Sequence, residues 1–106
     1  MYNSANDFMD YVENKNLGER EFLQAVEEVV DSLWGFLKDN PHYMHARILE
    51  RLVEPERVLM FRVPWLDDKG TMQVNRAFRI EFNSAIGPYK GGLRFHPSVN
   101  LSILKF

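Results

Sequence analysis

The sequence contains no cysteine, so it can form neither a disulfide nor a thiolate metal site, as suits a protein of a reducing compartment. It has no apolar run near the roughly 18 residues that a membrane-spanning helix requires. Its first residues lack the basic flank and apolar core of a secretory signal. It also lacks a basic excess, because 13 lysine and arginine residues face 15 acidic ones and give a net charge of −2. We therefore expect a soluble, cytoplasmic protein that binds neither nucleic acid nor a membrane.

The 106 residues contain no internal repeat and no low-complexity tract, and their 45% hydrophobic content suffices for one modest domain with a core. Apolar residues recur at helical spacing over residues 4–15, with Ser4 or Asn6 as a possible N-cap. A stronger apolar stripe runs over residues 19–38. These patterns predict two amphipathic helices near the start of the chain.

A third helix is expected over residues 41–52, because Asn40-Pro41 ends the second helix and proline suits a first helical turn. His42 and His45 lie three residues apart on this helix, but two histidines without a suitable third ligand make an incomplete metal site. The acidic face of the second helix indicates a solvated surface. We predict no metal site here, and we interpret residues 1–54 as a helical assembly segment.

After Glu54-Pro55 the apolar period changes to two, which predicts strands. One strand carries apolar residues on alternate positions from Leu59 to Trp65, and a second spans residues 71–82. Between them Asp67-Asp68-Lys69-Gly70 has hairpin composition, with Gly70 available for a left-handed position. A two-stranded hairpin is marginal alone, so other strands or a neighbouring subunit must complete the sheet.

Arg62 and Arg76 interrupt the apolar strand faces. Each could pair with a carboxylate, reach solvent at an edge, or lie in a subunit contact. The fold class expected from these elements is α/β, or α+β within these residues alone: helices, an antiparallel hairpin, and then the start of a further helix.

Regular patterning stops between Asn83 and Ser98, where glycine, proline and cations are concentrated. Gly87-Pro88 and Gly91-Gly92 surround Lys90 and indicate a shaped loop. A lysine beside bare glycine backbone leaves room for a small anion such as a carboxylate. The same spacing also fits a solvated turn that happens to hold a lysine, so the residue pattern leaves both interpretations open.

The run Gly-Pro-Tyr-Lys-Gly-Gly-Leu-Arg-Phe, at residues 87–95, resembles the amino-terminal substrate domain of hexameric glutamate dehydrogenases. The likeness extends upstream through Val63-Pro64-Trp65 and Pro55-Glu56-Arg57-Val58. Downstream it continues through His96-Pro97-Ser98-Val99-Asn100. Roughly the first 40 residues match the family only in general character.

This resemblance implies a place in a larger three-layer substrate domain, homohexamer assembly, and reversible oxidative deamination of glutamate to 2-oxoglutarate and ammonia with NADP or NAD. By the same resemblance Lys90 binds a substrate carboxylate, and Gly91 and Gly92 let the main chain approach the substrate. Arg94 and His96 match the family motif and are either structural or functional. Residues 55–106 would then be the first part of the substrate-binding domain.

The family's catalytic lysine and nucleotide-binding domain have no counterpart in these residues. No Gly-x-Gly-x-x-Gly follows a strand, so we expect no catalytic residue, no bound cofactor and no dehydrogenase activity from these residues alone. Ser98 or Asn100 could cap a final helix, whose pattern is incomplete at Phe106, as expected of a cut inside a longer protein. Two alternatives are a stand-alone interaction module with a dehydrogenase-like scaffold and, against the acidic balance, a phosphate or nucleic-acid binder using Lys90 and Arg94.

Overall fold

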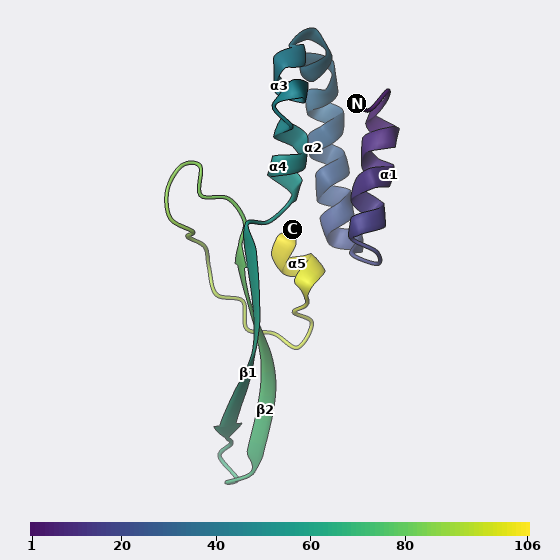
Figure 1. Ribbon diagram of the computed structural model, residues 1–106. Helices are drawn as coiled ribbons and strands as arrows, with labels where there is room; N and C mark the ends of the chain where they lie inside the picture. The colour runs from purple at the N-terminus through teal and green to yellow at the C-terminus, as the bar shows by residue number, and fades with distance from the viewer.

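The computed structural model describes residues 1–106 and contains five helices and one antiparallel hairpin. Four helices gather at one end of the molecule, and the hairpin projects from them, with a short last helix between the two parts (Figure 1). The elements are α1 (Ala5–Lys15), α2 (Arg20–Asp39), α3 (Pro41–His45), α4 (Ile48–Val53), β1 (Arg57–Leu66), β2 (Met72–Glu81) and α5 (Leu101–Lys105). This arrangement confirms the α+β class. None of these helices is long and apolar enough to cross a membrane.

The hydrophobic core lies entirely within the helical part. Its eight buried apolar residues come from the stripes predicted on the first two helices and from α4. Phe8 and Val30 are fully enclosed, because the helical period places one such residue on the inner face at every turn. The complete set is Phe8, Val12, Phe22, Val26, Val30, Leu37, Leu49 and Val53.

The first helix begins where the sequence predicted, and Ser4 rather than Asn6 is its N-cap. The Ser4 hydroxyl accepts a hydrogen bond from the Asp7 backbone N–H at 3.1 Å, which satisfies one of the free donors of the first turn. At the other end of α1, the Asn16 amide donates to the Val12 carbonyl at 2.8 Å and closes the last turn. These two side chains fix the length of α1.

The expectation of one continuous third helix over residues 41–52 is wrong. The chain breaks at Arg47, which has φ 56° and ψ 39°, and so separates α3 from α4. This left-handed conformation is unfavourable for an arginine, and the guanidinium is held by Glu50 at 2.8 Å. The change of direction places Leu49 and Val53 in the core while Tyr43 stays partly exposed, so burial of α4 accompanies the strained residue.

The predicted hairpin is confirmed, with a register that pairs Arg57 with Glu81 at the open end and Leu66 with Met72 at the turn. In the turn, the Asp67 carboxylate accepts hydrogen bonds from the N–H groups of Lys69 and Thr71, both at 2.9 Å. Gly70 has φ 74°, the left-handed position expected of it. Asp67 therefore fixes both the turn and the register of the ladder.

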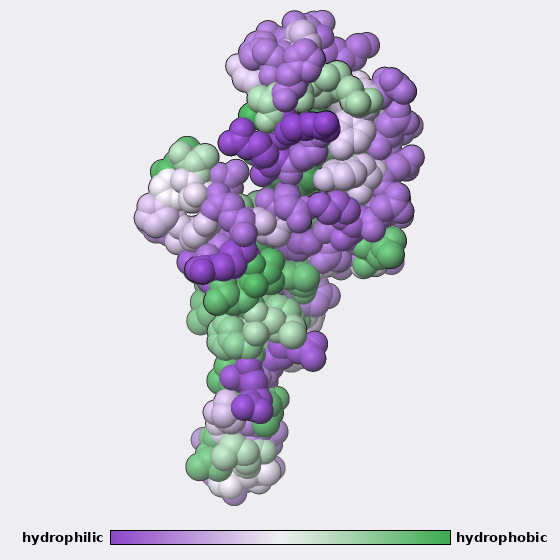
Figure 2. Space-filling view, in the orientation of Figure 1, coloured by the Kyte–Doolittle hydropathy of each residue, from purple (hydrophilic) through white to green (hydrophobic).

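The hairpin is exposed on both faces along β1, where every residue is accessible. The radius of gyration is 17.5 Å, and the longest dimension is 61 Å. A compact chain of this length would have a radius near 13 Å, so the hairpin does not fold back onto the core. Hydrophobic residues cover much of its surface, whereas hydrophilic residues dominate the visible face of the helices (Figure 2). An apolar surface of this kind is typical of a site covered by other protein segments.

Arg62 and Arg76 lie directly opposite each other in the ladder. Neither forms an ion pair with a carboxylate of this chain, so the first of the three predicted roles does not occur within the chain. Like charges at opposed positions are unfavourable. This position is therefore suited to solvent or to acidic groups from another segment or subunit.

Candidate functional site: the glycine-rich loop

The loop of residues 82–100 leaves the end of β2, extends away from the molecule and returns beside the hairpin to α5 (Figure 1). Lys90 lies on it, exposed, and its ammonium makes no hydrogen bond or ion pair with this chain. A Cβ atom built on Gly91 or Gly92 would meet nothing within 4 Å, and neither glycine has a positive φ. Nothing in the chain itself requires glycine there, so the open space beside these two residues is available to other groups.

The first part of the loop is tied to the start of β1 by Glu56. Its carboxylate accepts hydrogen bonds from the Ser84 backbone N–H at 3.0 Å, from the Ser84 hydroxyl at 2.9 Å, and from the Tyr89 hydroxyl. The Tyr89 bond is the main cause of a lowered pKa of the Glu56 carboxyl, and the same bond raises the pKa of the Tyr89 hydroxyl. Both directions favour a carboxylate paired with a protonated phenol.

Two arginines of the hairpin lie near this anchor, and one of them, Arg79, contacts the loop directly. Arg79 donates to the Tyr89 carbonyl at 3.2 Å, so the peptide group between Tyr89 and Lys90 is held directly. Arg57 forms a bidentate pair with Glu81, at 2.7 and 3.1 Å, across the last rung of the ladder. The sequence analysis named Glu56 only as one residue of a segment that resembles glutamate dehydrogenases, and it predicted no role for its side chain. Its contact with Tyr89, 33 residues away, carries no local signal.

The second part of the loop is shaped by its own residues. His96 Nδ1 accepts from the Ser98 backbone N–H at 3.2 Å and lies 2.8 Å from the Ser98 hydroxyl, while the Val99 N–H donates to the His96 carbonyl. His96 therefore has a structural role in a turn within these residues. Arg94 is exposed and has no partner in the chain. Of the two predicted caps of the last helix, Asn100 is the one used, because its side chain accepts from the Ile103 N–H at 2.9 Å.

Helix α5 joins the loop to the beginning of α2, and sequence reasoning missed this contact. The N-cap residue of α2, Glu19, provides no side-chain cap. Instead the buried Ser102 hydroxyl accepts from the Phe22 N–H at 3.2 Å and donates to the Glu21 carboxylate at 2.7 Å. This bond is the main cause of a lowered pKa of the Glu21 carboxyl. A residue 80 positions away thus caps α2.

Lys105 adds a buried ion pair to the same contact. Its ammonium lies 2.8 Å from the Glu19 carboxylate, 2.6 Å from the Asn16 side-chain oxygen and 4.6 Å from the centre of the Phe22 ring. The Lys105 side chain is only 7% exposed, so its charge is compensated mainly by these neighbours. The loop is consequently anchored at both ends, to the hairpin by Glu56 and to α2 by α5.

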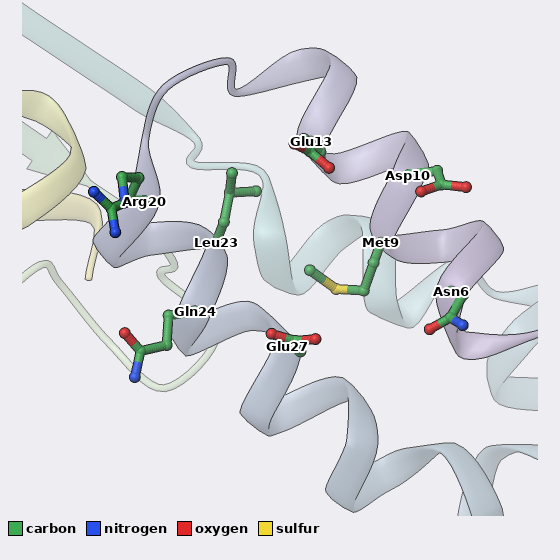
Figure 3. A pocket seen from close by; sticks show the side chains of 8 residues that line it. All are labelled: Asn6, Met9, Asp10, Glu13, Arg20, Leu23, Gln24 and Glu27. Carbon is green, nitrogen blue, oxygen red and sulfur yellow. The ribbon is translucent and has the colours of Figure 1, made fainter.

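A hollow of about 510 Å³ lies elsewhere, between α1 and α2. Its lining includes the carboxylates of Asp10, Glu13 and Glu27, and the guanidinium of Arg20 (Figure 3). No three acidic or histidine side chains in the chain are placed to hold a metal ion together, His42 and His45 included. The groove contains no residue of the glycine-rich loop, and its chemistry is that of a hydrated surface.

Comparison with known proteins identifies the fold and the loop. The family model described as Glu/Leu/Phe/Val dehydrogenase, dimerisation domain, matches residues 55–106, which include the hairpin, the loop and α5. The chain belongs to the Glu/Leu/Phe/Val dehydrogenase family. It is 64% identical over 103 residues to the NADP-specific glutamate dehydrogenase of Salmonella typhimurium, covering 97% of this chain and 23% of that protein.

Two further members of the family support this assignment. The NAD-specific glutamate dehydrogenase of Porphyromonas gingivalis is 58% identical over 100 residues, 94% of this chain and 22% of that protein. A solved glutamate dehydrogenase structure superimposes with a TM-score of 0.90 at 54% identity, covering 96% of this chain and 24% of that one. The chain thus spans about a quarter of the length of the dehydrogenases that it matches.

The described residues do not fit the nicotinamide cofactor that members of this dehydrogenase family use. A dinucleotide site needs parallel strands followed by a glycine-rich turn into a helix. The only sheet here is an antiparallel pair, and the loop after β2 leads into the five-residue helix α5. These residues therefore do not form a dinucleotide site, and the unpaired cations of the loop are Lys90 and Arg94.

Proposed function

We propose that this chain is the substrate-binding and assembly part of an NAD(P)-dependent glutamate dehydrogenase, which interconverts glutamate with 2-oxoglutarate and ammonia. The observation that carries the proposal is the state of Lys90, a lysine with a free ammonium on a loop that is anchored at both ends. The names of the relatives supply the substrate, glutamate. Glutamate and 2-oxoglutarate each carry two carboxylates, which are the groups that a lysine ammonium pairs with. The stand-alone interaction module is not favoured, since nearly all of residues 1–106 match part of a glutamate dehydrogenase.

In this function Lys90 pairs with one carboxylate of the substrate. A charge-assisted hydrogen bond in a site shielded from water fixes the orientation of the bound molecule and favours dicarboxylates over apolar amino acids. Gly91 and Gly92 leave open space next to Lys90, so a substrate can approach the main chain there. The role of these three residues is binding and orientation, and proton transfer and cofactor binding belong to other parts of the enzyme.

We assign residues 1–54 to helical assembly contacts and residues 55–106 to the first part of the substrate-binding domain. The exposed hairpin is the main candidate for an interface between copies, because an uncovered apolar surface of this size is unfavourable in water. We propose a homohexamer in the cytoplasm, without nucleic-acid or membrane partners. The cofactor is NADP or NAD, since relatives specific for each are similar to this chain.

The test is to extend the coding sequence past Phe106, express the full-length protein and measure glutamate-dependent reduction of NADP and NAD. We expect activity in the full-length protein and none in residues 1–106 alone. Lys90→Ala should raise the KM for glutamate by about 10- to 100-fold, as expected from the loss of a charged hydrogen bond. Lys69→Ala, in the hairpin turn, is the matched control and should leave the KM unchanged.

Two results would refute the proposal. An unchanged KM in the Lys90→Ala enzyme would exclude the carboxylate pairing. A full-length protein without glutamate-dependent activity, but with stable self-association, would support the stand-alone interaction module instead.

A further inference from the structure

Lys90 has no contact of its own that defines its position, so its placement depends on its neighbours. Ser84 and Tyr89 lie on either side of the Gly87-Pro88 turn, and both donate hydrogen bonds to the same carboxylate, that of Glu56. One Glu56 oxygen accepts hydrogen bonds from the Ser84 backbone N–H and hydroxyl, and the other accepts one from the Tyr89 hydroxyl. The two ends of the turn are therefore held together by the Glu56 carboxylate.

Glu56 is itself fixed to the hairpin. Its backbone N–H donates to the Phe82 carbonyl at 3.1 Å, one step beyond the rung that pairs Arg57 with Glu81. The Phe82 ring lies 6.1 Å from the ring of Phe22 on α2 and packs against the core. The point that holds the turn is therefore part of the rigid ladder.

The residue next to Lys90 is held in two directions. The Tyr89 hydroxyl is bound to Glu56, and the Tyr89 carbonyl accepts from Arg79 at 3.2 Å. The side chain and the following peptide group of Tyr89 are therefore both fixed, which determines where the chain enters Lys90. The ammonium of Lys90 remains free for a ligand.

We propose that Glu56 is a positioning residue for substrate binding, acting through Tyr89 and Ser84 to hold Lys90 in place. This inference rests on the proposed function, because it assumes that Lys90 binds the substrate carboxylate. A lysine on a loosened loop would still bind a carboxylate, but the cost of ordering the loop would weaken binding. Losing Glu56 should therefore raise the KM and leave the reaction of bound substrate unaffected.

The experiment compares four variants of the full-length protein. Tyr89→Phe and Glu56→Ala should raise the KM for glutamate by about five- to tenfold, with kcat and the KM for the cofactor unchanged. Glu56→Gln can still accept from Ser84 and can donate to the Tyr89 oxygen, so it should restore a KM within about twofold of the unmodified enzyme. Tyr43→Phe, on α3 and outside this cluster, is the matched control and should have no effect.

Amide hydrogen exchange of residues 83–92 is measured on the same variants, and it does not depend on activity. Faster exchange there in Tyr89→Phe and Glu56→Ala, but not in Tyr43→Phe, together with the KM effect, supports the positioning role. Unchanged exchange, an unchanged KM, or a fall in kcat alone overturns it. If the unmodified full-length protein is inactive the proposed function fails, whereas the exchange rates still decide whether Glu56 orders the loop.

Discussion

The contact between α5 and α2 makes a quantitative prediction for Ser102→Ala. The Ser102 hydroxyl is the only side chain that caps the beginning of α2, and it accepts the hydrogen bond of the buried Phe22 N–H at 3.2 Å. Alanine removes this acceptor without adding volume that would have to be accommodated. The Phe22 N–H would then be buried without a partner, because Ser102 itself is only 5% exposed.

The magnitude follows from these two losses. Replacing an N-cap serine with alanine costs about 1 kcal/mol, and a buried unpaired amide costs about 1–3 kcal/mol. The two descriptions overlap, so we expect a loss of about 2 kcal/mol in the free energy of unfolding. For a chain of this size that loss lowers the Tm by about 10 °C. The bond to Glu21 adds little, because its carboxylate regains water.

The assay is urea denaturation of the chain followed by far-UV circular dichroism, with Ser32→Ala as the control. Ser32 lies on the exposed side of the same helix, where its hydroxyl donates to the Val29 carbonyl at 2.8 Å. Alanine is the better helix former, so this control should be as stable as the unmodified chain or more stable by up to about 0.5 kcal/mol. A loss below about 0.5 kcal/mol in Ser102→Ala would refute the capping of α2 by α5.

Three further predictions follow from the core, the loop and the hairpin. Val30→Ala, at a fully buried position, should cost about 2 kcal/mol in urea denaturation, whereas Val29→Ala, at a neighbouring position 48% exposed, should change stability by less than about 0.5 kcal/mol. The hydrogen bond between the Tyr89 hydroxyl and the Glu56 carboxylate should contribute fully to stability between pH 4.5 and pH 10.0, because the Glu56 pKa is lowered from 4.5 and the Tyr89 pKa is raised from 10.0. Its contribution is lost as the pH falls through the folded-state Glu56 pKa or rises through that of Tyr89. The pKa of Tyr2 is raised as well, so a tyrosine absorbance titration should show more than one group above 10.0, of which Tyr89→Phe removes one. Phe61→Asp on β1 should reduce self-association of the full-length protein in light scattering more than Leu17→Asp on the exposed α1–α2 turn, because the hairpin is the main candidate interface.

The fold was largely predictable because its elements depend on local patterns. The stripes that give α1 and α2, the alternation that gives β1 and β2, and the Asp67–Gly70 turn all act within a few residues of sequence. The break at Arg47 was not predictable, because arginine carries no preference for the left-handed region. Its position is set by the burial of Leu49 and Val53, and that burial depends on the rest of the helical part.

The site was only partly predictable, because some of its features depend on local sequence and others on contacts between distant residues. The composition around Lys90 marks the loop and its cationic groups, and Asn100 carries a recognisable cap signal. The anchors of the loop are pairs of residues far apart in sequence, Glu56 with Tyr89 and Ser102 with Phe22. A single sequence contains no period or motif that joins such pairs, so only the folded chain brings them together.

The two anchors of the loop, Glu56 at the hairpin and Ser102 at α2, also connect the hairpin to the helical part. Helix α5 contacts both α2 and β2, and it fastens to α2 through the buried Ser102 and Lys105. The loop begins at the hairpin, where Glu56 holds it, and ends at α5, so any movement of the hairpin against α2 must change the separation of the loop's ends. Because Lys90 lies between these ends, contacts that cover the apolar hairpin would also limit how far Lys90 can move. Under the proposed function, assembly through the hairpin and substrate binding at Lys90 would therefore be mechanically connected, since the same ladder carries the proposed interface and the Glu56 anchor.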